Sequence, residues 1–247
     1  MTNEILYLKQ EFDRIKALGY VKSSRKGLTG IGKTFEDLIG KEEDTLDTPD
    51  YKGIEIKTKR GYTKSYTTLI NATPKGKSEF EIKRLCHIYG YPDKVLKDHK
   101  VLAFSVQTNK PTFVANRYLF KLKIEKNEQK IYLIIHDKNM KLLEKYVYWD
   151  FNTIKEKLER KLKYLALVKA WPKSINGIDY YKYYNIQFYQ LKNFDSFLKL
   201  MEQGMIRITF KIGVFREGVR TGEIHDRGTS FEIQELNFEK LFNKIYT

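Results

Sequence analysis

The sequence contains one cysteine, Cys86, among its 247 residues. A single thiol excludes an intramolecular disulfide and a cysteine-rich metal site, and it agrees with a reducing compartment. Long apolar runs are also absent: IYLII at 131–135 is far shorter than the roughly 20 residues of a membrane helix. The N-terminal MTNEILYLKQEF carries acidic residues where a signal peptide is basic. These absences predict a cytoplasmic protein without membrane contact.

Arginine is scarce, since it supplies only ten of the 46 basic residues. Such lysine richness can follow from an AT-rich genome, so the net charge of +15 is weak evidence by itself. Its distribution says more. Basic residues gather at 22–27, 52–60 and 211–220, and acidic residues gather at 36–47. A nuclease requires both kinds of residue: basic side chains neutralise the DNA phosphates, and carboxylates hold a metal ion.

No internal repeat or low-complexity segment appears, so the chain is expected to fold as one integrated unit. Hydrophobic periodicity predicts helices at 3–18, 34–39, 151–164 and 194–203. Strand patterns occur at 54–56, 67–70, 101–107, 118–125, 130–137, 165–171, 205–215 and 230–233. The order of these elements predicts an α/β (α+β) fold with a mixed sheet covered by helices. Trp-Pro-Lys-Ser near 172 predicts a boundary between a lobe of residues 1–171 and a lobe of residues 172–247.

The stretch GLTGIGKT at 27–34 fits the phosphate-loop pattern G-x-x-x-x-G-K-[ST]. A phosphate loop needs a hydrophobic strand in front of it, and VKSSRK is not one. The helix that follows is short, because Gly40 and an acidic cluster come soon after it, and this also argues against a phosphate loop. One feature favours an NTPase: the apolar run IYLIIHD ends in Asp137, as a magnesium-binding strand does. The other interpretation is a glycine turn before a helix that faces solvent or a DNA phosphate. We therefore expect no nucleotide cofactor and keep the NTPase as a minor alternative.

The strongest chemical signal is TPDYKGIEIKT, which contains Asp50, Glu55 and Lys57. In a strand, Glu55 and Lys57 share one face while Ile54 and Ile56 enter the core. If Asp50 lies beside Glu55, their carboxylates can share a hard divalent cation, and Lys57 can position the attacking water. The alternative is ordinary alternating charge on an exposed strand, but the preceding Pro-Asp favours a nuclease.

A helical acid, Glu36, lies shortly before this segment and is a candidate to orient or complete the same metal site. Its alternative role is to stabilise the first turn of a helix through the helix dipole. Three basic residues of the same region, Arg25, Lys26 and Lys33, are expected to bind DNA.

A second cluster lies in KIGVFREGVRTGEIHDRGTSFEI. Its cations offer the donors that a guanine edge accepts, and Asp226 can accept from a cytosine amino group. The alternative is a solvated hairpin. His225 and Asp226 are adjacent and face opposite sides of an extended chain, so a catalytic dyad is disfavoured. The expected DNA-binding residues here are Lys211, Arg216, Arg220, His225, Asp226 and Arg227.

These segments resemble the MvaI/BcnI family of restriction endonucleases, which is similar to the mismatch-repair nickase MutH. The resemblance rests on SRKGLTGIGKTFEDL, KEEDTLDTPDYKGIEIKT, VYWDF with KLKYLALV, and IGVFREG through HDRGTSFEI. It implies a PD-(D/E)xK core in a two-lobed MutH-like clamp, and a monomer that cuts double-stranded DNA with Mg²⁺ at short C/G-rich sites. By position it makes Asp50, Glu55 and Lys57 the catalytic triad and Glu36 the helical acid. The loop at His225 to Arg227 becomes a base-reading segment.

The sequence also departs from the family. Arg227 stands where related enzymes carry a second histidine, and Glu232 stands where a basic residue is expected. Residues 75–115 find little match, and this insertion is expected to include an arm with His87 or His99 as DNA contacts. Two further functions are carried as alternatives: a MutH-like strand-nicking endonuclease and a DNA-binding module that does not cut.

Overall fold

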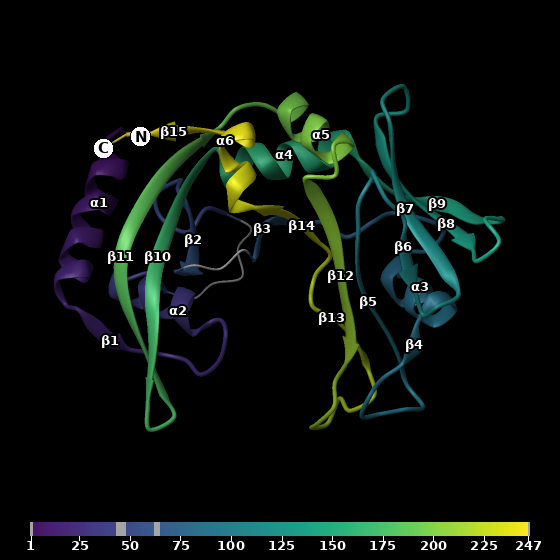
Figure 1. Cartoon of the computed structure of the whole chain (residues 1–247), viewed down its shortest axis with the longest axis horizontal. Helices are drawn as coiled ribbons and strands as arrows, with labels where there is room; N and C mark the ends of the chain where they lie inside the picture. Colours follow the sequence, from purple (N-terminus) through teal and green to yellow (C-terminus); the bar gives the residue numbers. More distant parts are fainter. Residues whose placement is uncertain (1, 43–47, 62–64, 247) are drawn as a thin grey trace. The chain divides into compact units, whose positions relative to one another are not determined.

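The computed structural model describes residues 2–42, 48–61 and 65–246, so residues 43–47 of the acidic segment lie outside the described part. In the described residues the chain is a mixed α/β protein with three β-sheets. It forms two compact units, each made of separate chain segments (Figure 1). Unit 1 holds Met1–Ser65, Lys157–Asn193 and Phe238–Thr247, and unit 2 holds Tyr66–Glu156 and Phe194–Asn237.

Unit 1 contains one sheet with the strand order β1-β11-β10-β2, and β15 also pairs with β11. Strand β10 is parallel to β2 and antiparallel to β11. The elements of unit 1 are α1 (Thr2–Ala17), β1 (Tyr20–Lys22), α2 (Gly30–Leu38), β2 (Glu55–Arg60), β10 (Tyr164–Ile175), β11 (Ile178–Leu191), α6 (Phe238–Leu241) and β15 (Phe242–Ile245). Helix α4 (Phe151–Leu162) contains the chain boundary between the units.

The core of unit 1 forms where the apolar stripes of α1 and α2 meet the buried faces of β2, β10 and β11. Phe12 of α1 contacts Phe35 of α2 with ring centroids 6.4 Å apart, and Phe35 contacts Tyr183 of β11 at 5.2 Å. The Tyr183 hydroxyl donates to the carbonyl of Ile31 at 2.7 Å, which satisfies its only polar atom within the core. Helix α2 is therefore fixed against the sheet whose edge strand is β2.

Unit 2 contains a six-stranded sheet, β3-β14-β12-β5-β4 with β13 on β12, and a four-stranded sheet, β6-β7-β8-β9. Its elements are β3 (Tyr66–Asn71), α3 (Glu81–Tyr89), β4 (Tyr91–Pro92), β5 (Lys100–Val106), β6 (Thr112–Val114), β7 (Tyr118–Glu125), β8 (Lys130–Asp137), β9 (Leu142–Asp150), α5 (Phe194–Glu202), β12 (Ile206–Val214), β13 (Ile224–Asp226), β14 (Ser230–Gln234) and η1 (Glu235–Asn237).

The segment 75–115 is part of the framework of unit 2. It supplies α3, β4, β5 and β6, and β5 lies between β12 and β4 in the six-stranded sheet. Phe104 of β5 stacks on Phe210 of β12 with centroids 4.6 Å apart. DNA contact by His87 or His99 stays a prediction.

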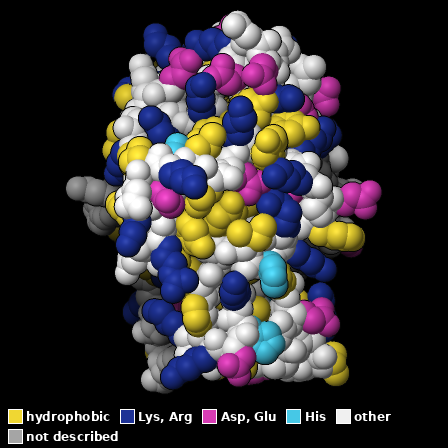
Figure 2. Space-filling view, turned by 90° about the vertical axis from the view of Figure 1, so that its right-hand side faces the viewer, with side chains coloured by type: hydrophobic (Ala, Val, Ile, Leu, Met, Phe, Trp, Pro, Cys, Tyr) yellow, Lys and Arg dark blue, Asp and Glu magenta, His cyan; other side chains and the backbone are white. Residues whose placement is uncertain are grey.

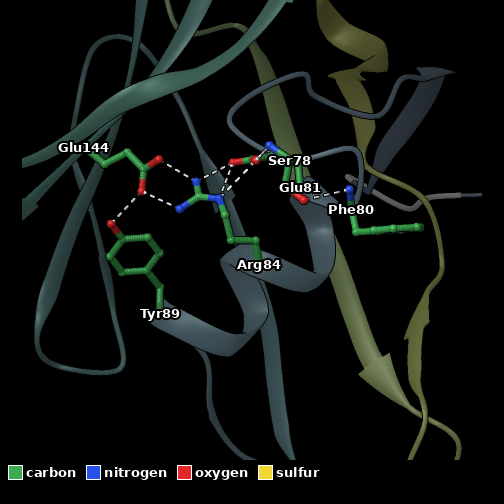
Figure 3. A network of polar contacts seen from close by, with 6 residues as sticks. All are labelled: Ser78, Phe80, Glu81, Arg84, Tyr89 and Glu144. Atoms are coloured by element: carbon green, nitrogen blue, oxygen red, sulfur yellow. Dashed lines mark hydrogen bonds and ion pairs between the residues drawn. The ribbon is translucent and has the colours of Figure 1, made fainter.

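Helix α3 is held to strand β9 by a buried polar network (Figure 3). The Arg84 guanidinium donates to both Glu81 and Glu144, with Nη1 3.1 Å from Glu144 Oε2. The Tyr89 hydroxyl donates to the same Glu144 oxygen at 2.8 Å. Glu81 is 1% exposed and Glu144 is 4% exposed, so Arg84 neutralises two carboxylates that water barely reaches.

Several elements lie where their periodicity placed them, including α1, α4, α5, β7 and β8. Others differ: α2 begins at Gly30 instead of Thr34, and α3, β9 and the tyrosine-rich β11 were not expected. Residue 172, the expected lobe boundary, lies within β10 of unit 1, and the division into cutting and reading lobes stays a prediction. None of the helices in the described part of the chain is long and apolar enough to cross a membrane.

Candidate active site

A two-residue turn brings Asp50 to strand β2. Tyr51 and Ile54 exchange backbone hydrogen bonds of 2.9 and 2.8 Å, and both residues between them have positive φ, 43° at Lys52 and 85° at Gly53. This is the pattern of a type I′ hairpin turn, which favours glycine at its second central position. The turn lets Asp50 Oδ2 accept a hydrogen bond from the Ile56 amide at 2.9 Å. The gap of four residues between Asp50 and Glu55 is thus closed by local chain geometry.

Glu55 and Lys57 lie on one face of β2, as the alternation of the strand predicts. Ile54 and Ile56 are 0% and 4% exposed and enter the core, while Lys57 Nζ donates to Glu55 Oε1 at 2.5 Å. Glu55 is itself only 1% exposed. Burial raises its pKa; the Lys57 charge opposes that rise and the Asp50 charge adds to it.

One oxygen of Glu55 lacks a partner. Its Oε2 atom is buried and accepts no hydrogen bond from any described residue. Buried carboxylate oxygens are normally satisfied, so an orphaned one indicates a ligand that the protein atoms do not supply. A hard divalent cation suits this oxygen together with the carboxylate of Asp50.

Lys161 is a second cation at Glu55 and was not anticipated from the sequence. Its Nζ lies 3.9 Å from Glu55 Oε1. Helix α4 ends at Leu162, and β10 then pairs with β2 with Leu165 opposite Glu55, so the last turn of the helix reaches the carboxylate. No local pattern could have revealed this residue, because it reaches the site through strand pairing over a long chain separation.

Glu36 lies on α2 near the same carboxylates. Burial raises its pKa, and the nearby Asp50 charge raises it further. Glu36 lines a surface depression of about 300 Å³. The lining residues are Arg25, Leu28, Thr29, Ile31, Gly32, Lys33, Glu36 and Thr58. The depression thus combines the helical acid with two of the three basic residues expected to bind DNA in this region, while Lys26 is exposed outside it.

The three carboxylates do not form a dense metal cluster. In residues 2–42, 48–61 and 65–246, no group of three or more histidine, cysteine, aspartate or glutamate side chains is arranged to hold a metal ion. Of the three carboxylates, Asp50 and Glu55 are the two whose oxygens could hold a cation together.

The GLTGIGKT segment has the structure of a glycine turn. Helix α2 begins at Gly30, three residues before Lys33, and residues 23–29 form a loop without strand structure. A Cβ atom on Gly30 would lie 2.4 Å from the carbonyl oxygen of Arg25, so only glycine fits there. Lys33 forms an ion pair with Asp37 one turn along the helix. The buried strand that a phosphate loop requires does not precede this turn.

The expected base-reading residues all belong to unit 2, and three of them, Lys211, His225 and Asp226, lie on strands of the six-stranded sheet. Lys211 of β12 donates to Ser230 at 2.9 Å and pairs with Glu232 at 2.8 Å. Glu232 also accepts from Arg207 and Thr209. Burial alone would raise the pKa of Glu232, but these hydrogen bonds together lower it, so it stays ionised. Asp226 Oδ1 accepts from the Gly228 amide at 2.9 Å.

The loop between β12 and β13 has its own internal contacts. His225 stacks on Phe215 with centroids 4.2 Å apart, and the Arg220 guanidinium lies 4.3 Å from the same ring. Arg216 forms a two-pronged ion pair with Asp93, with contacts of 3.2 and 2.8 Å, which lowers the pKa of Asp93. Arg227 is exposed. Arg216 thus ties this loop to the turn before β5, whereas its expected contact with a base stays a prediction.

Comparison with known proteins identifies the family. A model of the MvaI/BcnI restriction endonuclease family matches residues 9–242. The solved complex of restriction endonuclease MvaI with its cognate DNA substrate is 33% identical, covers 99% of this chain and 98% of that chain, and gives a TM-score of 0.92. MvaI in the absence of DNA has the same identity and coverage with a TM-score of 0.63. No match was found among curated proteins. The chain belongs to the MvaI/BcnI restriction endonuclease family, whose members are DNA hydrolases.

Proposed function

We propose that the chain is a type II restriction endonuclease that uses Mg²⁺ to hydrolyse double-stranded DNA at a short C/G-rich site, leaving 5′-phosphate ends. In this proposal the sheet of unit 1 with α2 is the PD-(D/E)xK core, and the enzyme acts as a monomer. The observation that carries the proposal is the meeting of Asp50, Glu55 and Lys57 beside the Tyr51–Ile54 turn. The relative solved with its cognate DNA substrate supports DNA as the partner.

Asp50 and Glu55 would hold the cation, because Glu55 Oε2 is buried without a protein partner and both groups are hard oxygen ligands. A Mg²⁺ ion held by these two carboxylates would supply charge that polarises the scissile phosphate and makes water nearby more acidic. The Lys57 ammonium orients the attacking water and offsets the charge that grows on the phosphate oxygens. Water oxygen bonds to phosphorus, the bond from phosphorus to the 3′-oxygen breaks, and a proton ends on that oxygen as the 3′-hydroxyl.

Other residues are assigned supporting roles. Arg25 and Lys33 line the depression beside Glu36 and are proposed to contact DNA phosphates, together with exposed Lys26. Lys161 adds positive charge at Glu55. In unit 2, Lys211, Arg220, His225, Asp226 and Arg227 are proposed to face the bases, while Arg216 holds their loop through Asp93.

Supercoiled plasmid and a methylation-free genome test the proposal directly. With Mg²⁺ the full chain should give discrete fragments, and sequencing the fragment ends reports activity, site and cut position together. Nicked circles alone would replace the proposal with a MutH-like nickase. A gel shift in Ca²⁺ without cleavage in Mg²⁺ would indicate a module that binds without cutting. ATP should change none of these results, because no phosphate loop is proposed.

The raised pKa of Glu55 predicts that this residue costs stability at neutral pH. A carboxyl group whose pKa is higher in the folded than in the unfolded chain binds protons more tightly when folded. Stability therefore rises as pH falls through the raised folded pKa. We expect Glu55→Gln to abolish cleavage yet melt at a higher temperature than the wild type at pH 8, with a smaller difference at pH 5. Thermal unfolding at both values checks this, and a lower melting temperature of Glu55→Gln at pH 8 contradicts it.

A further inference from the structure

The two faces of the four-stranded sheet in unit 2 differ in burial. Strand β8 alternates between Ile131, Leu133 and Ile135, all 0% exposed, and Tyr132 and Ile134 on the opposite face. Strand β7 likewise sends exposed Lys121 and Lys123 outward around buried Leu122. One face of this sheet therefore packs into unit 2, and the other presents aromatic, apolar and basic side chains.

Tyrosines form the centre of this outer face. Tyr132 and Tyr148 are direct cross-strand partners on β8 and β9, with ring centroids 5.9 Å apart. Tyr146, two residues before Tyr148 on β9, lines the same depression and is 50% exposed. We call Tyr132, Tyr146 and Tyr148 the tyrosine platform. They line a depression of about 540 Å³ together with Lys123, Glu125, Glu128, Lys130, Ile134 and Lys145.

Lysines surround the tyrosine platform. Lys130 Nζ lies 4.3 Å from the Tyr148 ring centroid, and Lys77 Nζ lies 4.1 Å from that of Tyr146. With Lys121, Lys123 and Lys145 they place five lysines at this face against two glutamates, Glu125 and Glu128. Figure 2 shows the side of the molecule that lies on the right in Figure 1, where hydrophobic side chains alternate with many lysine and arginine and several acidic side chains.

We propose that the tyrosine platform binds single-stranded DNA. Every unpaired base has a flat face that stacks on tyrosine, and the strand carries phosphates that lysines neutralise. Duplex DNA offers the phosphates but keeps its base faces stacked inside the helix, so it would leave the tyrosines without partners. An apolar protein surface would pack on the tyrosines, but it would leave the five lysine charges without anionic partners. The combination of an aromatic floor with a basic rim selects a single strand.

Binding of a fluorescein-labelled ten-nucleotide oligothymidine to the full chain, without divalent metal, tests this proposal by fluorescence anisotropy. Tyr148→Ala and Tyr132→Ala should each weaken binding about tenfold, because each removes one stacking surface. Tyr132→Phe keeps the ring and should bind as the wild type does. Tyr7→Ala, an exposed tyrosine of α1 in unit 1, is the matched control and should have no effect.

The rim is tested by the salt dependence of the same binding. Each phosphate contact to a single strand contributes about 0.7 to the slope of log affinity against log salt concentration. Lys123→Ala combined with Lys130→Ala should reduce that slope by about 1.4, following from two lost contacts. Lys110→Ala, an exposed lysine of unit 2 outside the depression, should leave the slope unchanged.

A photo-crosslink locates the bound strand. Oligothymidine with one 5-iododeoxyuridine should crosslink to peptides that contain Tyr132, Tyr146 or Tyr148. Crosslinks found only elsewhere, unchanged affinity in both alanine variants, or equal competition by a blunt duplex would each overturn the proposal. The variants should cut duplex DNA at the wild-type rate, and because the binding assay needs no metal, a chain that never cuts leaves this result interpretable on its own.

Discussion

Asp50→Asn is expected to leave the protein folded and to abolish DNA cleavage. Asparagine keeps an oxygen that can accept the hydrogen bond from the Ile56 amide, so the Tyr51–Ile54 turn stays intact. It removes the negative charge that a divalent cation requires, and loss of the metal removes several kcal/mol of transition-state stabilisation. Cleavage should fall by more than about 1000-fold, since each 1.36 kcal/mol is tenfold in rate. Fragment formation from plasmid under single-turnover conditions measures the loss.

In the same assay, the cleavage rate of Lys57→Ala should be about 100- to 1000-fold lower than that of the wild type, because the substitution removes one preorganised donor at the reacting phosphate. Lys182→Ala is its control: this exposed lysine lies on β11 of the same sheet, opposite Tyr20. Circular dichroism and melting temperature should match the wild type for the Asp50→Asn and control chains. If Asp50→Asn cleaves DNA at the wild-type rate, the role of Asp50 is only to stabilise the Tyr51–Ile54 turn.

Arg84→Ala is expected to lower the free energy of unfolding of unit 2 by about 3–5 kcal/mol, because it leaves buried carboxylates without their cation. Glu81 and Glu144 are 1% and 4% exposed, and both contact the guanidinium in the wild type. Lys83→Ala on the same helix removes an exposed charge and should change stability by less than about 0.5 kcal/mol. Urea denaturation followed by tryptophan fluorescence compares the two, since Trp149 is buried in this unit.

The cause of that loss can be separated from simple truncation. Without Arg84 two buried carboxylates have no cation beside them, and an unpaired buried charge is costly. Adding Glu81→Gln and Glu144→Gln to Arg84→Ala removes the stranded charges and should restore part of the stability at pH 8. A defect of Arg84→Ala that the two glutamine substitutions do not relieve would indicate lost packing and not unpaired charge.

Local patterns predicted the parts of this molecule that short-range chemistry determines. The alternation that buries Ile54 and Ile56 also places Glu55 beside Lys57, and the β7 and β8 strands lie at the expected residues. Helix α2 was expected to start later because glycine is a poor helix former. It begins at Gly30, where the close approach to the Arg25 carbonyl excludes any side chain. Tertiary contact overrides intrinsic propensity there.

Contacts between residues far apart in the chain could not be predicted from local sequence patterns. Lys161 reaches Glu55 only because β10 runs parallel to β2. Arg216 contacts Asp93, which lies 123 residues before it in the chain. The neutralising role of Arg84 depends on Glu144, which lies on another element. None of these partners has a fixed sequence spacing. The expected DNA contacts of His87 and His99 were drawn from an absence of family match, and β5 shows that the same segment also has a structural role.

Strand β11 pairs with strands from distant parts of the chain. Tyr20 lies opposite Lys182, and β15, near the end of the described chain, completes the other side of β11. Both units combine segments that are far apart in the chain, and contacts of such long range form slowly. A chain still emerging from the ribosome would thus carry the Asp50 turn without the sheet that supports it. The turn gains its neighbouring strand only after β10 has been made, because Leu165 of β10 pairs with Glu55 of β2.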